Sequence, residues 1–310
     1  MLSRTAENLY WLARYMERAD STARLIEMGR RMALLPRALG QDEWRSVIRA
    51  SGVAIEAAAS ERRLSEVDCV GALLLSPDNP SSIRCCLARA RANGRAVRTA
   101  LTRDMWDVLN EDWRRLDQID ERSACQDLPH LLEWVERRAA TFRGAVSSGM
   151  LRSDRYDFLQ LGSYVERADM MLRLLDVKYY VLLPETEVAG GSRDHHQWTS
   201  VLHANSAIRA YHHVYRGDYS PWKIADFLIL NANFPRSLAH SYRRVGEHLE
   251  QLARRYGTRH TCHTTANEMI AHLSDTGMGE IFQTGLHEFI TETIGVTGRL
   301  SNEIGQAYHF

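Results

Sequence analysis

Two Glu-Arg pairs are the residues of this chain whose types and spacing could support catalysis or ligand binding. Glu17-Arg18 and Glu166-Arg167 each stand within the same short pattern, Tyr-x-Glu-Arg-Ala-Asp. A carboxylate can serve as a general acid or base, and a guanidinium group can hold a carboxylate or phosphate through two hydrogen bonds. Glu17 and Glu166 are therefore the weak catalytic candidates that the sequence offers.

Arginines and tyrosines elsewhere are candidates for binding a ligand or a partner protein. Segment 83–103 carries six arginines and no acidic residue, and four of the six share one face if the segment is a continuous helix. Such a face favours an anion site or an acidic partner surface, whereas a solvated or neutralised face is the simpler alternative. The binding candidates of the whole chain are Arg18, Arg24, Arg167, Arg173, Arg84, Arg91, Arg95, Arg98, Tyr15 and Tyr164.

The same charged residues also have a purely structural interpretation. In both patterns the aspartate precedes an arginine by four residues, the spacing of helical ion pairs that contribute about 0.2–0.5 kcal/mol each. Glu17 and Glu166 would then pair with arginines of neighbouring helices and fix the register of a bundle. A functional role requires that the two glutamates line a solvent-connected cavity, and a structural role requires closed packing around them.

The elements that must position these residues are helices. Apolar residues recur at helical spacing over long stretches, and prolines number only seven, which predicts an all-α fold. Ser3 is the expected N-cap of a first helix that runs to about Leu35, and Ser65 with Asp68 predicts a capping box. Further helices are expected at about 42–59, 65–75, 81–108, 128–149, 154–182, 195–215, 221–230, 236–256, 264–274 and 279–308.

An internal repeat divides the chain into two halves. Segment 12–27 matches segment 161–176 at eight of sixteen positions, and two further pairs of segments match in the same order at nearly the same offset. This pattern indicates tandem duplication of a unit of about 150 residues. We therefore expect a helical bundle of two similar halves, 1–150 and 151–310, packed as one compact unit about a pseudo-two-fold axis.

Composition narrows the function classes further. Lys+Arg and Asp+Glu both number 39, and this balance argues against a nucleic-acid partner. No apolar run approaches the ~18 residues of a membrane-spanning helix, so we expect no membrane partner. Five cysteines without a disulfide-type spacing favour a cytoplasmic location. The histidines lack metal-ligand spacing and no phosphate-binding glycine motif occurs, so we expect neither a metal nor a cofactor.

The N-terminal segment MLSRTAENLYWLARYMERADSTARL resembles the opening of the bacterial alpha-E family. Stretches that start at Asn79, Tyr156 and Phe234, and the C-terminal LHEFITETIG and AYHF, match it as well, so the resemblance covers essentially the whole chain. It implies an all-helical protein encoded beside, or fused to, circularly permuted ATP-grasp proteins and near transglutaminase-like peptidases. It further implies a part in making or modifying amide bonds in small peptides, with the family's recurrent Glu-Arg pairs at the two positions named above.

Three functions remain open from the sequence. In the first, the chain is an accessory or binding partner of an ATP-grasp-type amide-bond-forming enzyme, with a transglutaminase-like peptidase as a further partner. In the second, it is an enzyme of that pathway, with Glu17 and Glu166 as acid/base groups and the nearby arginines as clamps. In the third, it is a purely structural helical protein, and a homo-oligomer is compatible with all three. We favour the first because no nucleophile–base or metal signature is present.

Overall fold

A computed structural model of the protein describes residues 1–34, 43–53, 63–181 and 192–310. Over these ranges the fold is all-α, with fifteen α-helices, one π-helical segment (Val70–Leu75), one 3-10 turn (Arg98–Ala100) and no strand. The helices are α1 (Ser3–Ala33), α2 (Glu43–Ala50), α3 (Glu66–Cys69), α4 (Ile83–Ala96), α5 (Arg103–Asp117), α6 (Glu121–Gln126), α7 (Leu128–Gly149), α8 (Asp154–Val181), α9 (Ser192–Ala204), α10 (Ile208–Tyr215), α11 (Pro221–Ile229), α12 (Leu238–Tyr256), α13 (Thr261–Asp275), α14 (Met278–Thr284) and α15 (Leu286–Ala307).

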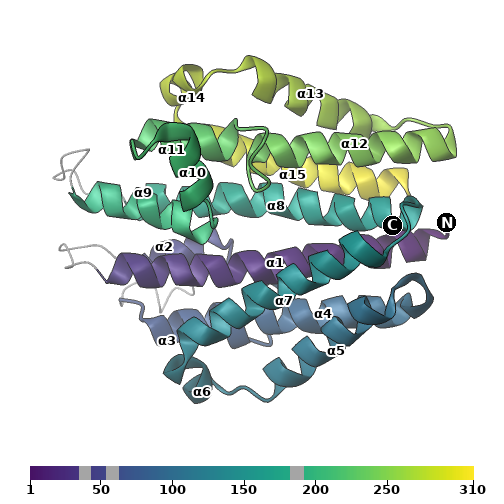
Figure 1. The fold of residues 1–310 in the computed structure, drawn as a ribbon, viewed down its shortest axis with the longest axis horizontal. Helices are drawn as coiled ribbons and strands as arrows, with labels where there is room; N and C mark the ends of the chain where they lie inside the picture. Colours follow the sequence, from purple (N-terminus) through teal and green to yellow (C-terminus); the bar gives the residue numbers. More distant parts are fainter. Residues whose placement is uncertain (35–42, 54–62, 182–191) are drawn as a thin grey trace.

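Two long helices, α1 and α8, lie side by side across the middle of the molecule (Figure 1). The helices α4 and α7 pack on α1, and α12 and α15 pack on α8. Both central helices are covered on most of their faces, so apolar residues such as Leu12, Met16, Val165 and Leu172 are buried. Polar residues on the same two helices are buried with them, and they form the site described below.

Gly162 on α8 sets how closely the two central helices approach. A Cβ atom at this position would lie 2.1 Å from the carbonyl oxygen of Tyr10 on α1, so a side chain cannot be accommodated without separating the helices. The missing Cβ therefore allows the backbones of α1 and α8 to come into direct contact.

The outer helices repeat one packing scheme around the central pair. Helix α5 packs on α4 and α7, and helix α13 packs on α12 and α15. Helix α2, which follows α1 in the chain, also packs on α8, and α9, which follows α8, also packs on α1. The N-terminal and C-terminal parts of the chain are thereby interlocked through α2 and α9.

Three of the long helices expected from the sequence are broken in the structure. In place of one helix over 81–108, α4 ends at Ala96 and α5 begins at Arg103, where the Thr102 side chain accepts a hydrogen bond from the Met105 N–H at 3.3 Å. The expected helix over 195–215 is divided into α9 and α10, and the one over 279–308 is divided at Gly285, whose φ is +103°. Apolar spacing continues through these turns and hides them from a periodicity analysis.

Capping decides several other helix ends. Ser65 and Asp68 form the expected capping box. Ser3, however, is not an N-cap, because it is already the first residue of α1 and no side chain caps that helix. The expected helix over 42–59 corresponds to α2, while 54–62 lie outside the described residues. Helix α6 has no counterpart among the predicted helices.

None of the described helices is both long enough and apolar enough to span a membrane.

Candidate functional site

The two central helices bring the two Glu-Arg pairs together in a reciprocal arrangement. Arg167 on α8 donates from Nε to Glu17 Oε1 at 2.6 Å and from Nη2 to Glu17 Oε2 at 3.0 Å. Arg18 on α1 donates from Nε to Glu166 Oε1 at 2.5 Å and from Nη2 to Glu166 Oε2 at 3.0 Å. Each glutamate is therefore held by a two-pronged guanidinium contact from the opposite helix, the strongest geometry for such a pair.

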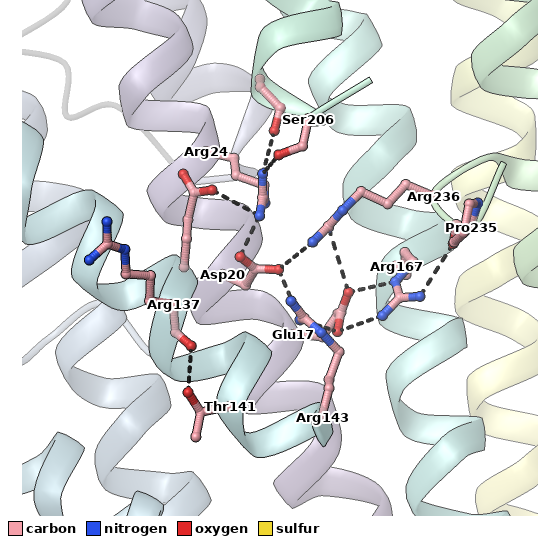
Figure 2. Close-up of polar contacts among 12 residues, drawn as sticks. Glu17, Asp20, Arg24, Arg137, Thr141, Arg143, Arg167, Ser206, Pro235 and Arg236 are labelled. Atoms are coloured by element: carbon pink, nitrogen blue, oxygen red, sulfur yellow. Dashed lines mark hydrogen bonds and ion pairs between the residues drawn. The ribbon is translucent and has the colours of Figure 1, made fainter. Parts of the chain in front are cut away.

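Around Glu17 the network extends to a second acid and two further arginines (Figure 2). Arg143 on α7 donates from Nη1 both to Glu17 Oε2 at 3.1 Å and to Asp20 Oδ2 at 3.0 Å. Arg236, in the loop before α12, donates from Nη2 to Asp20 Oδ2 at 2.9 Å. Glu17 and Asp20, which lie one helical turn apart on α1, thus share cations supplied by α7, α8 and the α11–α12 loop.

Arg24 continues this network toward α7 and α9. Its Nε donates to Asp20 Oδ1 at 3.1 Å, and its Nη2 lies 2.8 Å from Glu136 Oε2 on α7. Its Nη1 donates to the Ala204 carbonyl and to Ser206 Oγ, both at 2.9 Å (Figure 2). The expected i,i+4 pair is confirmed, and Arg24 also closes the carbonyl end of α9.

Glu166 is surrounded by fewer charges. Besides Arg18 it receives a hydrogen bond from Arg14 Nε at 2.7 Å. The Nη1 of Arg14 donates to Ser301 Oγ on α15 at 2.6 Å, and the Nη1 of Arg18 donates to Ser81 Oγ at 3.3 Å. Neutral hydroxyls thus take one further hydrogen bond from each of these two arginines.

The acids of this network are closed to solvent and held ionised. Glu17 is 1% exposed and Glu166 is 0% exposed. Burial by itself raises the pKa of Glu17, but the guanidinium groups of Arg167 and Arg143 outweigh burial and set that pKa at about 2. Arginines likewise hold the pKa values of Glu166 and Asp20 below their usual range against the effect of burial. A carboxylate in this state has no proton to donate near neutral pH and no open path to a substrate.

Neither Glu17 nor Glu166 lies in the walls of the described cavities, which are lined by residues of α1, α5, α12, α13, α15 and adjoining loops. One of these cavities reaches the edge of the network at Ser301. The near-zero exposed fractions of the two glutamates agree with the closed packing expected for a structural role.

Arg173 and the two candidate tyrosines lie at the edge of the network. Arg173 donates from Nε to Asp169 Oδ2 at 2.7 Å, the expected i,i+4 pair, and from Nη1 to the Ala50 carbonyl on α2 at 3.5 Å. The ring of Tyr15 contacts Arg18 at 5.9 Å, and the ring of Tyr164 contacts Arg167 at 5.0 Å. Both tyrosines are half-buried, and each adds a cation–π contact to the arginine beside it.

The prediction that four arginines of segment 83–103 share one helical face is wrong, because the helix ends before the last of them. Arg98 lies in the 3-10 turn beyond the end of α4, where its guanidinium group stacks on Trp106 at 4.5 Å. Arg84 donates to the carbonyls of the α5–α6 turn, and Arg91 donates to Asn110 Oδ1 at 2.8 Å. Only Arg95 of the four is an exposed residue of α4 with no contact of this kind among the described residues.

Several residues of the network were not among the site residues that the sequence predicted. The unpredicted members include Arg14, Arg143, Arg236, Ser81 and Ser301. Arg143 and Arg236 lie more than a hundred residues from Glu17 and outside the matching Glu-Arg segment, so no local pattern relates them to it. Asp20 was detectable, because it belongs to the repeated pattern itself.

No metal centre is found among the described residues, since no group of three or more His, Cys, Asp or Glu side chains converges there. His263, the most suggestive of the histidines, is instead tied to the backbone. Its Nε2 lies 3.1 Å from the Leu249 carbonyl, and its Nδ1 accepts the His260 N–H at 3.0 Å.

Comparison with known proteins gives one family. Residues 1–309 match Alpha-E, described as a predicted alpha-helical domain with a conserved ER motif. Glu-Arg pairs of this kind stand at the centre of the network, at Glu17-Arg18 and Glu166-Arg167. No curated protein and no solved structure gives a significant match. The match over nearly its whole length, together with the all-α fold, shows that the chain belongs to the Alpha-E family.

Proposed function

We propose that this protein is a non-catalytic helical partner of an ATP-grasp-type amide-bond-forming enzyme. The observation that supports this most is the state of its best catalytic candidates. Glu17 and Glu166 are buried, ionised and each bound by at least two guanidinium groups. Side chains used in this way hold helices in register rather than transfer protons.

The alternative of an enzyme that uses the two glutamates lacks this support. A general acid must carry a proton at the working pH, and a general base must reach the proton that it removes. With its pKa at about 2, Glu17 meets neither condition, because it is also sealed from solvent. The arginine clamps of that hypothesis are likewise occupied by acids of the chain itself.

The exposed arginines of α4 supply a surface for the proposed partner. Arg89 and Arg95 are both exposed on α4, in a segment that contains no acidic residue. Arg89 lies over the ring of Tyr15 at 5.7 Å, which limits the freedom of its side chain before binding. An acidic patch on the enzyme, or a carboxylate-bearing peptide held by it, is the complementary partner for these groups.

Co-purification with an ATP-grasp protein of the kind that the family resemblance implies tests the proposal. We expect a tagged chain to retain that protein at moderate salt, and Arg89→Glu with Arg95→Glu to weaken retention at least tenfold. Arg254→Glu, at an exposed position on α12, is the matched control and should retain the partner normally. Failure to associate, together with unchanged product formation when this chain is omitted, would contradict the proposal.

We also infer that the fold arose by duplication of a helical unit, with copies at 1–150 and 151–310. The reciprocal Glu-Arg contacts support this, as does the recurrent packing of α4 and α7 on α1 and of α12 and α15 on α8. Superposition of the two halves should pair α1 with α8, α4 with α12 and α7 with α15. A superposition that pairs these helices in another order would contradict the proposed duplication.

A further inference from the structure

A cavity of about 820 Å³ lies at the end of the molecule that holds the C-terminus. It is open to solvent and is lined by the α12–α13 loop, the start of α13 and the last turns of α15 (Figure 1). Its volume falls within the range of about 300–1,000 Å³ that is usual for small-molecule sites. Its walls are predominantly polar in residue type, with two threonines, two histidines, an asparagine, a glutamine, an arginine and a glutamate.

The charge on these walls is not balanced. Arg259 is already paired with Glu250, whose Oε2 lies 2.7 Å from its Nη2. Glu303 on α15 has no ion-pair partner among the described residues, and its Oε2 is buried without a hydrogen bond. A buried carboxylate oxygen without a donor is costly, because it has lost its water and gained no replacement. The cavity therefore lacks a positive charge at Glu303.

The histidines of the cavity do not supply that charge. His263 contacts the Leu249 carbonyl through Nε2 and accepts the His260 N–H at Nδ1, so both of its ring nitrogens are already engaged. His260 contacts the Thr258 hydroxyl through Nε2 at 3.4 Å, and its ring lies edge-on to Tyr308 at 5.6 Å. Both imidazole rings thus line the cavity, and the described contacts include no hydrogen bond from either ring to Glu303.

A second hollow of about 310 Å³ adjoins the cavity and extends it along α12 and α13. The two share Arg259, His263 and Asn267 as lining residues. The second hollow is also lined by the acids Glu247 and Glu250, which are paired with arginines of the chain. A ligand anchored at Glu303 therefore has room for an elongated chain that runs toward α12.

We propose that this cavity binds a small organic cation, with an ammonium or guanidinium group seated on Glu303. Such a group neutralises the unpaired carboxylate through a charge-assisted hydrogen bond to the part of it that faces the cavity. The hydroxyls of Thr261 and Thr264 and the amides of Asn267 and Gln306 then hydrogen-bond the polar remainder of the ligand. This site is independent of the proposed partner surface on α4.

Calorimetric titration of the full-length protein with a matched series of amines tests the proposal. Nα-acetyl-lysine amide carries a side-chain ammonium, glycine amide carries an α-ammonium, and Nα,Nε-diacetyl-lysine amide carries neither. We expect at least one ammonium probe to bind about tenfold or more tightly than the diacetylated probe, because an ion pair replaces a neutral contact. The stronger of the two ammonium probes identifies whether a side chain or a chain terminus is the natural source.

Variants distinguish this site from general attraction to an acidic surface. Glu303→Gln keeps the shape of the side chain and should weaken ammonium binding about tenfold, the effect of losing about 1.4 kcal/mol. Glu268→Gln, on an exposed position of α13 outside the cavity walls, should bind as the wild type does. Thermal unfolding of both variants checks that they are folded. Equal binding of the diacetylated probe, unchanged binding by Glu303→Gln, or no binding of either ammonium probe at millimolar concentration would each overturn the proposal.

Discussion

Glu17 and Glu166 are held in the same way by the opposite central helix, but their surroundings differ in charge. Glu17 shares its pocket with a second acid, Asp20, and the two draw on arginines from α7, α8 and the loop before α12. Among the described residues, Glu166 has no second acid in contact and receives hydrogen bonds only from Arg14 and Arg18. A serine hydroxyl accepts a hydrogen bond from the Nη1 of each of those two arginines.

This difference indicates how a buried charge network responds when one of its acids is removed. A cation left without its acid in a low-dielectric interior is strongly destabilising, whereas a cation with a second acid within reach retains part of its stabilisation. Arg143 has such a second acid, since it donates to Asp20 as well as to Glu17. Arg14 and Arg18 have only Glu166 as a carboxylate partner among the described contacts. The Glu17 cluster is therefore partly redundant, since Arg143 and Arg236 also contact Asp20 although Arg167 contacts Glu17 alone, whereas the described contacts of the Glu166 cluster offer no second acid.

The largest effect is expected from Glu166→Gln. This change leaves two mostly buried arginines without an acid, and we expect a loss of about 3–5 kcal/mol in the free energy of unfolding. Glu17→Gln should cost about 1–2 kcal/mol less, because Asp20 remains to hold Arg143 and Arg236. Urea unfolding at pH 7 measures both. Glu268→Gln, at an exposed position of α13, is the control and should lie within about 0.5 kcal/mol of the wild type. Equal losses at Glu17 and Glu166 would break the comparison.

The pH dependence of the free energy of unfolding is expected to have opposite signs for the contributions of Glu17 and Asp112. The folded pKa of Glu17 is about 2, below its ordinary value of 4.5, so its stabilisation is complete above about pH 4.5 and is lost as pH falls toward 2. This term amounts to about 3 kcal/mol. Unfolding curves of the wild type and Glu17→Gln should therefore converge between pH 4.5 and 2. A constant difference between them over that range would show that Glu17 is not held ionised by its arginines.

Asp112 on α5 should behave in the opposite sense. Burial raises its pKa to about 6 from an ordinary value of 3.8, even though Arg138 Nε lies 2.5 Å from its Oδ1. Its contribution is therefore complete below about pH 3.8 and declines as pH rises through 6, by about 2–3 kcal/mol. Asp112→Asn should lose less stability at pH 8 than at pH 4, relative to the wild type. A larger loss at pH 8 would mean that the Arg138 contact outweighs burial. The pKa of Asp112 would then be lowered in the folded protein, as that of Glu17 is.

The sequence predicted the centre of this network better than its periphery. The two Glu-Arg pairs were recognisable because the same pattern occurs twice, and their pairing with arginines on other helices is confirmed. Arg143 and Arg236 could not be found, because tertiary packing rather than sequence spacing brings them to Asp20. The fold class followed from periodicity, but the turns at Thr102 and Gly285 did not, because they depend on capping and on a positive φ. The arginine face failed for the same reason, since it required α4 to continue past Ala96.

The smallest effects are expected at the two serines that flank Glu166, and they sharpen the comparison. Ser301 is buried, accepts from Arg14 at 2.6 Å and lies 2.9 Å from the Tyr10 hydroxyl, so Ser301→Ala should cost about 1–3 kcal/mol. Ser81 is half-buried and 3.3 Å from Arg18, so Ser81→Ala should cost about 0.5 kcal/mol or less. Urea unfolding resolves the two. If both changes leave the free energy of unfolding unchanged, the serine hydroxyls do not substitute for a second acid. The two clusters would then differ only in the number of arginines that contact each glutamate.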